Sequence, residues 1–150
     1  MSVSAAALHG AWSLEAWRIE HDDSRPPAYP FGDDATGQIL YAPEGRMSAV
    51  ISRRDRAGLD AASIHAASAQ SCRDAYTSFF CYAGRWHVDG DDVVHTAELA
   101  LNPDMAGTQQ RRHVRLHGDR LELSATETDA RGRARTHRII WRRVRPAPTP

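Results

Sequence analysis

The chain has 150 residues, in which 19 arginines and no lysine balance 19 acidic residues to a formal net charge of zero. A chain of this length forms one domain and can bury about 68–70% of its unfolded surface, so it needs no disulfide or structural metal. The lack of lysine excludes Schiff-base chemistry and phosphate-loop sites that depend on a lysine amine. With two cysteines, no metal-ligand motif and no basic, apolar leader in residues 1–10, we expect a cytoplasmic protein without a metal.

The charges are unevenly distributed along the chain. Residues 1–110 carry 8 arginines and 15 acids, whereas residues 111–150 carry 11 arginines and 4 acids. A basic segment is one feature of nucleic-acid-binding proteins. Here the arginines alternate within strand patterns, as on a solvated sheet face opposite acidic neighbours, and there is no RNA-binding or helix-turn-helix signature. We therefore expect neither a nucleic acid nor a membrane as partner.

Period-two alternation of apolar and polar residues, broken by Gly, Pro and Asp turns, indicates an all-β fold. The pattern predicts eight strands, at residues 12–20, 37–42, 46–53, 81–88, 93–101, 109–117, 121–126 and 135–144. Residues 55–80 contain the one expected helix, which Ser71 can cap. We expect its face with Tyr76 and Phe79 to close one end of the β-structure. The domain covers residues 1–145, and residues 146–150 form a frayed tail.

Three predicted hairpins, with turns at residues 42–46, 88–91 and 116–121, determine which side chains share a face. Each hairpin has one apolar and one charged face. The inward set includes Tyr41 with Met47, then Tyr82, Trp86, Val93 and His95, and finally Arg112 opposite Ala125. Eight half-buried antiparallel strands close most economically into an up-and-down barrel with room for one small ligand, and a β-sandwich is the alternative.

Several short segments carry a resemblance to a known family. They are Gly-Ala-Trp at 10–12, and the segments 37–41, 45–49, 82–86, 118–121 and 141–144. In this order they resemble the bacterial and fungal lipocalin-like domain family. The resemblance implies an eight-stranded barrel that holds a small hydrophobic molecule, in proteins often found beside biosynthetic or catabolic enzymes. It also implies that Trp12 packs against Arg143 at the closed end of the barrel.

His95 and Arg112 are the candidate residues for chemistry. An inward histidine beside Tyr82 can transfer protons if its pKa lies near neutral, and the alternative is a core histidine satisfied by a neighbouring hydroxyl or carbonyl. An inward arginine can hold a carboxylate or an enolate oxygen, and the alternative is a buried pair with Glu98 or another acid near the end of the barrel. Small Ala125 leaves space opposite Arg112.

The remaining candidates would bind rather than react. Tyr41, Met47 and Trp86 would form an aromatic, polarizable wall for a flat or unsaturated ligand, and the alternative is that they are ordinary core residues.

We expect one of two functions. The first is a cofactor-independent isomerase, cyclase or dehydratase of secondary metabolism, acting by proton transfer on a small apolar metabolite with a carbonyl or enol group. His95 would be its acid and base, and Arg112 with Tyr82 would hold the oxyanion. The second is a non-catalytic carrier or sensor of a small hydrophobic ligand, while a barrel filled with side chains would be purely structural. Outward apolar residues, namely Leu40, Val50, Val94 and Ile140, suggest a possible homodimer.

Overall fold

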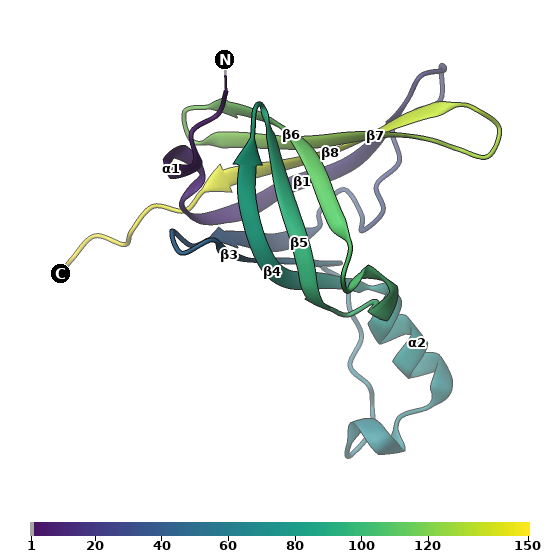
Figure 1. Ribbon diagram of the computed structural model, residues 1–150. Coiled ribbons are helices and arrows are strands. Elements are labelled where there is room, and N and C mark those ends of the chain that lie inside the picture. The colour runs from purple at the N-terminus through teal and green to yellow at the C-terminus, as the bar shows by residue number, and fades with distance from the viewer. Residues whose placement is uncertain (1) are drawn as a thin grey trace.

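Eight antiparallel strands close into a barrel in which each strand pairs with its neighbour in sequence and β8 pairs with β1 (Figure 1). The computed structural model describes residues 2–150. The strands are β1 (Gly10–His21), β2 (Thr36–Tyr41), β3 (Arg46–Ser52), β4 (Phe79–Asp89), β5 (Asp92–Ala100), β6 (Gln109–His117), β7 (Arg120–Thr128) and β8 (Ala134–Arg143). The predicted up-and-down barrel is confirmed, and the sandwich alternative is wrong.

The hairpin registers follow from the turn residues. Tyr41 pairs with Met47 across the first hairpin, and Trp86 pairs with His95 across the second. Leu116 pairs with Leu121 across the third. These pairings confirm the predicted sharing of faces along the central part of each hairpin.

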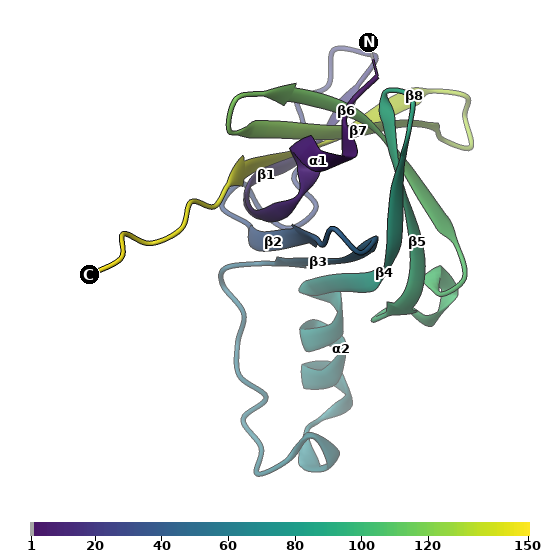
Figure 2. The same ribbon diagram turned by 60° about the vertical axis from the view of Figure 1, so that its left-hand side comes forward.

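A short helix closes one end of the barrel, but it is not the predicted one. The helix α1 (Ala5–Leu8) lies across that end (Figure 2), where Leu8 is fully buried and its carbonyl oxygen accepts a hydrogen bond from Trp12 Nε1 at 3.0 Å. Arg143 lies 4.1 Å from the centre of the Trp12 ring. The Arg143 guanidinium also donates to the carbonyl oxygens of Ala7 and His9. The predicted packing of Trp12 against Arg143 at the closed end is thus confirmed.

The predicted helix is α2 (Ala69–Thr77), and it extends away from the barrel below β4 (Figures 1 and 2). It contains no buried residue, and Tyr76 is 42% exposed. Ser68 rather than Ser71 caps it, because the Ser68 hydroxyl accepts the Ser71 N–H at 3.0 Å. Phe79 already belongs to β4, so the helix lacks the aromatic face that was expected to cover the barrel. Two short 3-10 helices, η1 (Ile64–Ala66) and η2 (Pro103–Met105), complete the fold.

Two β-bulges bend the wall of the barrel. One lies between Leu14 and Ala16 of β1, so inward positions change from even numbers to odd numbers along this strand. The other lies in β5, where Glu98 has no partner between the pairs Ala83–Leu99 and Gly84–Ala97. A Cβ atom at Gly84 would stand 1.9 Å from the Thr96 carbonyl oxygen, so only glycine allows this close approach of β4 and β5.

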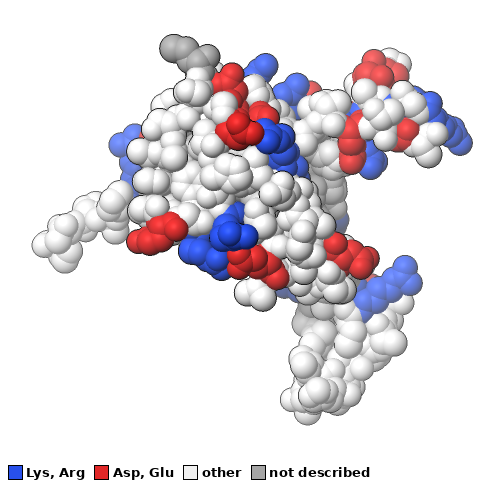
Figure 3. Space-filling model, viewed as in Figure 1, with Lys and Arg blue, Asp and Glu red and all other residues white. Residues whose placement is uncertain are grey.

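The arginines of the C-terminal strands lie beside acidic residues, as predicted for a solvated face. Arg138 contacts Glu20 at 2.6 Å and Glu122 at 2.7 Å. On the face shown in Figure 3, blue arginine atoms lie next to red acidic atoms. No helix among residues 2–150 is both long and apolar enough to cross a bilayer.

Two of the four outward apolar residues that suggested a homodimer are buried. Val94 is 2% exposed and Ile140 is 3% exposed, whereas Leu40 is 38% exposed. Val94 pairs across the sheet with His87 and Arg111, and Ile140 lies between the positions of Arg138 and Arg142 on the same face. Long neighbouring side chains cover small apolar ones in this way, and so little apolar surface is left on this part of the wall.

Candidate functional site

The barrel contains a cavity of about 320 Å³ to which all eight strands and η2 contribute side chains. Its apolar lining is formed by Trp17, Ile39, Ala49, Ile51, Phe80, Met105, Leu123, Ala125, Ile139 and Trp141. Its polar lining is formed by Tyr82, His95, Gln110, Arg112, Glu127 and His137. A cavity of this size with a few polar groups in an apolar wall is typical of small-molecule sites. The barrel is therefore not filled by its own side chains.

His95 lies between two tyrosine hydroxyls inside the barrel. Tyr41 Oη is 2.6 Å from His95 Nε2, and Tyr82 Oη is 2.6 Å from His95 Nδ1. Burial, together with the nearby charge of Arg112, lowers the pKa of His95 to about 3. This differs from the expected titration near neutral pH, because no carboxylate of residues 2–150 lies beside the ring to offset its burial. The imidazole is neutral, and both nitrogens are hydrogen-bonded, as the core-histidine alternative proposed.

The two tyrosines of this cluster stay protonated. Burial raises the pKa of Tyr82 to about 12 and raises the pKa of Tyr41 well above its usual value. We call Tyr41, His95 and Tyr82 the Tyr-His-Tyr cluster. Tyr82 and His95 line the cavity, whereas Tyr41 is not a lining residue.

Arg112 lines the same cavity and forms no ion pair with any carboxylate of residues 2–150. Its Nη1 donates to the Arg111 carbonyl oxygen at 3.0 Å, and its Nη2 is 3.4 Å from the Gln110 side-chain oxygen. Glu98, the acid named in the alternative, is instead held by Arg46 and Arg85. The predicted pairing of Arg112 with Glu98 or another acid is therefore wrong for residues 2–150, and the guanidinium retains donors for another acceptor.

A second polar cluster at the rim contains His137, Glu127 and Trp17. The Trp17 indole N–H donates to His137 Nδ1 at 3.2 Å, and His137 Nε2 lies 2.9 Å from Glu127 Oε1. Since an indole N–H can only donate, Nδ1 must accept and Nε2 must carry the proton that reaches Glu127. The His137 hydrogen bond and Arg135 lower the pKa of Glu127, so its carboxylate is ionised but already paired.

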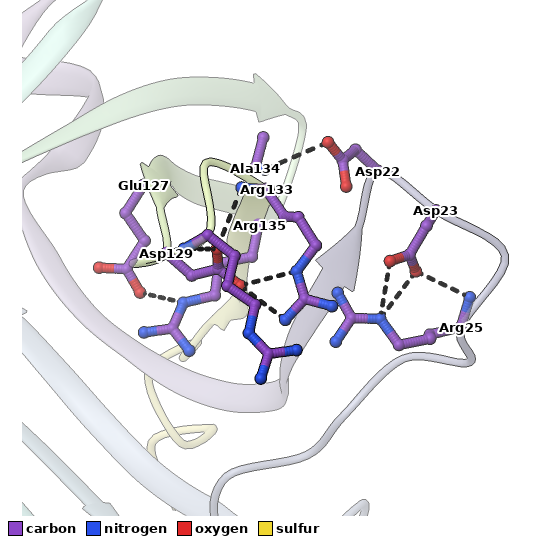
Figure 4. A network of polar contacts seen from close by, with 9 residues as sticks. Asp22, Asp23, Arg25, Glu127, Asp129, Arg133, Ala134 and Arg135 are labelled. Atoms are coloured by element: carbon purple, nitrogen blue, oxygen red, sulfur yellow. Dashed lines mark hydrogen bonds and ion pairs between the residues drawn. The ribbon is translucent and has the colours of Figure 1, made fainter.

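Carboxylates accept backbone hydrogen bonds in the β7–β8 turn, which lies beside this rim (Figure 4). Asp129 accepts backbone N–H groups of Arg131 and Arg133 in the β7–β8 turn. Asp22, which follows β1, accepts the Ala134 N–H at 3.1 Å. The end of β1 and the start of β8 are therefore held together next to Glu127.

Aromatic rings form the other side of the rim. Phe31, from the loop between β1 and β2, stacks on Trp17 with ring centres 5.2 Å apart. Phe80 tilts against Trp17 at 5.8 Å and meets the Tyr82 ring edge-on at 5.6 Å. A continuous aromatic surface thus leads from the rim to the Tyr-His-Tyr cluster.

The structure brings together four of the seven predicted site residues, since His95, Arg112, Tyr82 and Ala125 all line the cavity. The other three pack toward the closed end and are not lining residues. The Trp86 indole donates to the Ala42 carbonyl oxygen at 3.0 Å, and its ring contacts Tyr41 at 4.7 Å. Met47 is 4% exposed beside them. Alternation predicted that these side chains point inward, but it carries no information on how far along the barrel axis they lie.

Several lining residues were not singled out from the sequence. The bulge in β1 moved Trp17 onto the inward face, and the shift from Trp12 and Leu14 to Trp17 and Ile19 in the apolar pattern was the available signal. His137 shares parity with Ile139 and Trp141, but the long turn before β8 hid its direction. Nothing in the sequence predicted that Glu127 would pair with it.

Residues 9–144 match the family model of the lipocalin-like domain, which covers most of the chain. A search of curated proteins and a search of solved structures each found no match. A barrel of this kind fits the binding of a small hydrophobic ligand, in agreement with the cavity. The match and the closed eight-stranded barrel show that the chain belongs to the lipocalin-like domain family.

Proposed function

We propose that the barrel binds a small, largely apolar molecule that carries a carbonyl, enol or carboxylate oxygen at one end. The observation that carries this proposal is Arg112, a cation without a carboxylate partner in a mainly apolar cavity. Arg112 is half-buried, and its two contacts with Arg111 and Gln110 leave further N–H donors, which a ligand oxygen can accept. Tyr82, on the same cavity wall, offers a second polar contact.

The rest of the cavity suits the apolar part of the ligand. Aliphatic side chains from four strands line it, namely Ile39, Ala49, Ile51, Leu123, Ala125 and Ile139. The rings of Trp17 and Phe80 contact each other at the rim. Burial of apolar surface against these groups would supply most of the affinity, and Arg112 would set the orientation.

The test uses three probes of similar shape, namely naphthoate, acetylnaphthalene and ethylnaphthalene, with affinities measured by titration calorimetry. We expect the two oxygen-bearing probes to bind more tightly than the hydrocarbon. Arg112→Met should weaken naphthoate binding by about 10- to 100-fold, the range of a charge-assisted hydrogen bond, and leave ethylnaphthalene unchanged. Arg115→Met, at an exposed position of the same strand, is the matched control. Equal affinities for all three probes in the wild type would overturn the proposal.

A second candidate is a cofactor-independent isomerase, cyclase or dehydratase, supported by the donors beside the cavity. Arg112 and Tyr82 would stabilise a developing oxyanion, and His95 would exchange protons with the substrate through the Tyr82 hydroxyl. Keto–enol isomerisation needs no cofactor, because the proton that leaves carbon is returned to the same molecule.

The natural ligand decides between this enzyme and a carrier or sensor. Native mass spectrometry of the protein incubated with a cell extract would identify a retained metabolite. Chemical change of that metabolite by the wild type, but not by His95→Gln or Arg112→Met, would support the enzyme. Binding without change would support the carrier or sensor.

The cellular setting is also a proposal. Both cysteines are free, and Cys72 is exposed, which favours a reducing compartment such as the cytoplasm. A homodimer through exposed apolar residues such as Leu40 stays a prediction, which sedimentation velocity checks.

A further inference from the structure

We propose that Tyr41 and His95 are positioning residues that direct the Tyr82 hydroxyl proton into the cavity. Tyr82 then donates its hydroxyl hydrogen to whatever occupies the cavity, and it accepts a hydrogen bond from His95 rather than donating to it. The inference comes from counting donors and acceptors in the Tyr-His-Tyr cluster, whose two contacts are each 2.6 Å long.

A neutral imidazole has one N–H donor and one lone-pair acceptor. His95 is neutral because burial strongly disfavours its charged form. Its two nitrogens therefore play opposite roles toward the two tyrosines. One tyrosine donates its O–H to the ring, and the other accepts the ring N–H and keeps its own proton for a third group.

Burial decides which tyrosine donates to the ring. Tyr41 is 1% exposed, and in residues 2–150 its hydroxyl forms a hydrogen bond only with His95 Nε2. If Tyr41 accepted from His95, its own O–H would be buried without an acceptor. Such unpaired buried donors are disfavoured by roughly 5- to 150-fold in population. Tyr41 must therefore donate to Nε2, and the ring proton must lie on Nδ1.

Tyr82 is in the opposite situation. It accepts the proton of His95 Nδ1, and its own hydroxyl belongs to a residue that lines the cavity. The neighbouring Arg112 guanidinium has donors only, so it cannot accept the Tyr82 proton. The indole N–H of Trp141, another lining residue, also has no partner among residues 2–150. Tyr82, Arg112 and Trp141 therefore each offer a hydrogen-bond donor to the same cavity.

Because the Tyr82 hydroxyl donates into the cavity, fewer classes of ligand fit the site, an inference that rests on the proposed function. An oxygen held by Tyr82 and Arg112 receives two hydrogen bonds and offers none. Ketones, esters, enolates and carboxylates meet this requirement, whereas an ammonium group does not. The chain of hydrogen bonds from Tyr82 through His95 ends at Tyr41, whose hydroxyl has no further partner among residues 2–150 that could supply a proton. Any proton that Tyr82 gives to a substrate must therefore return to the cluster within the same turnover.

The test is the tautomer of His95 in the ligand-free protein, measured by ¹⁵N nuclear magnetic resonance of its side-chain nitrogens. The signals of His95 are assigned by their loss in His95→Gln. We expect Nδ1 to be protonated and Nε2 to be unprotonated in the wild type. A wild type with the proton on Nε2 would overturn the proposal, because Tyr82 would then donate to His95.

Two variants separate positioning from simple packing. Tyr82→Phe should retain the Nδ1 proton, because Tyr41 still needs the Nε2 lone pair. Tyr41→Phe removes the group that donates to Nε2, so the ¹⁵N signal of Nε2 should shift to that of a lone pair without a hydrogen bond, while the circular dichroism spectrum shows a folded barrel. An Nε2 signal unchanged from the wild type would contradict the role of Tyr41. Since no ligand is used, the result is independent of the probe titrations that test the proposed function.

Discussion

Two histidines of one cavity differ because different groups meet their ring nitrogens. His95 contacts two tyrosine hydroxyls, so nothing nearby stabilises an imidazolium. His137 contacts the Glu127 carboxylate on one side and the Trp17 indole on the other. A neutral histidine with a hydrogen bond at each ring nitrogen, such as His95, orients its two partners. A histidine paired with a carboxylate is fixed in a single tautomer.

The low pKa of His95 makes stability depend on pH. The unfolded state binds a proton at this residue near pH 6.5, whereas the folded state does so only near pH 3. Stability from this group is therefore complete above about pH 6.5 and falls as the pH decreases toward 3, with a slope of about 1.4 kcal/mol per pH unit. Urea unfolding between pH 7 and pH 4 should show this slope in the wild type, and His95→Gln should lack it. The exposed His65→Gln is the control, and parallel slopes in wild type and His95→Gln would contradict the assignment.

At the scale of elements, turn chemistry and alternation were sufficient for the strands and their registers. Each predicted strand ends within two residues of the observed one, because Gly, Pro and Asp break the alternation at every turn. The bulges were the main features that the sequence did not predict. One extra residue in β1 changes which side chains face inward. The predicted pairing of Arg112 with Ala125 lies beyond the last β6–β7 pair, His113 with Ser124, so the two residues line the cavity where these strands separate.

The close approach of β4 and β5 beside the β5 bulge leads to a prediction about Gly84. A Cβ atom there would overlap the Thr96 backbone, so Gly84→Ala must displace β5 near His95. We expect a loss of about 1–3 kcal/mol in the free energy of unfolding, the usual cost of overpacking. Gly58→Ala is the matched control, because no heavy atom lies within 4 Å of the added methyl group. Equal stabilities of the two variants in urea unfolding would show that the β4–β5 contact yields without cost.

For the whole molecule, the number and order of the hairpins predicted that the barrel closes. They did not predict which inward side chains line the cavity. Inward direction is a local property that alternation reports, whereas depth along the barrel depends on strand tilt and on the bulges. Tyr41 and Trp86 thus pack at the closed end although they share a face with Tyr82. Pairing between distant side chains, such as Arg138 with Glu20, is equally invisible to local patterns.

The opposite charges of residues 1–110 and 111–150 meet across the barrel wall. In each ion pair that joins these two parts among residues 2–150, the acid comes from the first part and the base from the second. Examples are Asp89 with Arg111, Glu15 with Arg142 and Glu20 with Arg138. Four arginines of the basic C-terminal part, namely Arg111, Arg120, Arg138 and Arg142, thus meet acids of the first part on the barrel wall.

This charge distribution predicts that salt destabilises the protein. Each exposed pair contributes about 0–1 kcal/mol, and the Debye length falls from about 30 Å at 0.01 M to about 10 Å at 0.1 M ionic strength. We therefore expect sodium chloride over this range to lower the free energy of unfolding by about 1–3 kcal/mol, measured by urea unfolding at pH 7. Glu20→Gln removes one pair between the two parts and should reduce the salt dependence, whereas Glu44→Gln, in the exposed turn between β2 and β3, should not. A stability that stays constant or rises with salt in the wild type would mean that these pairs add nothing and that burial of apolar side chains alone holds the barrel closed.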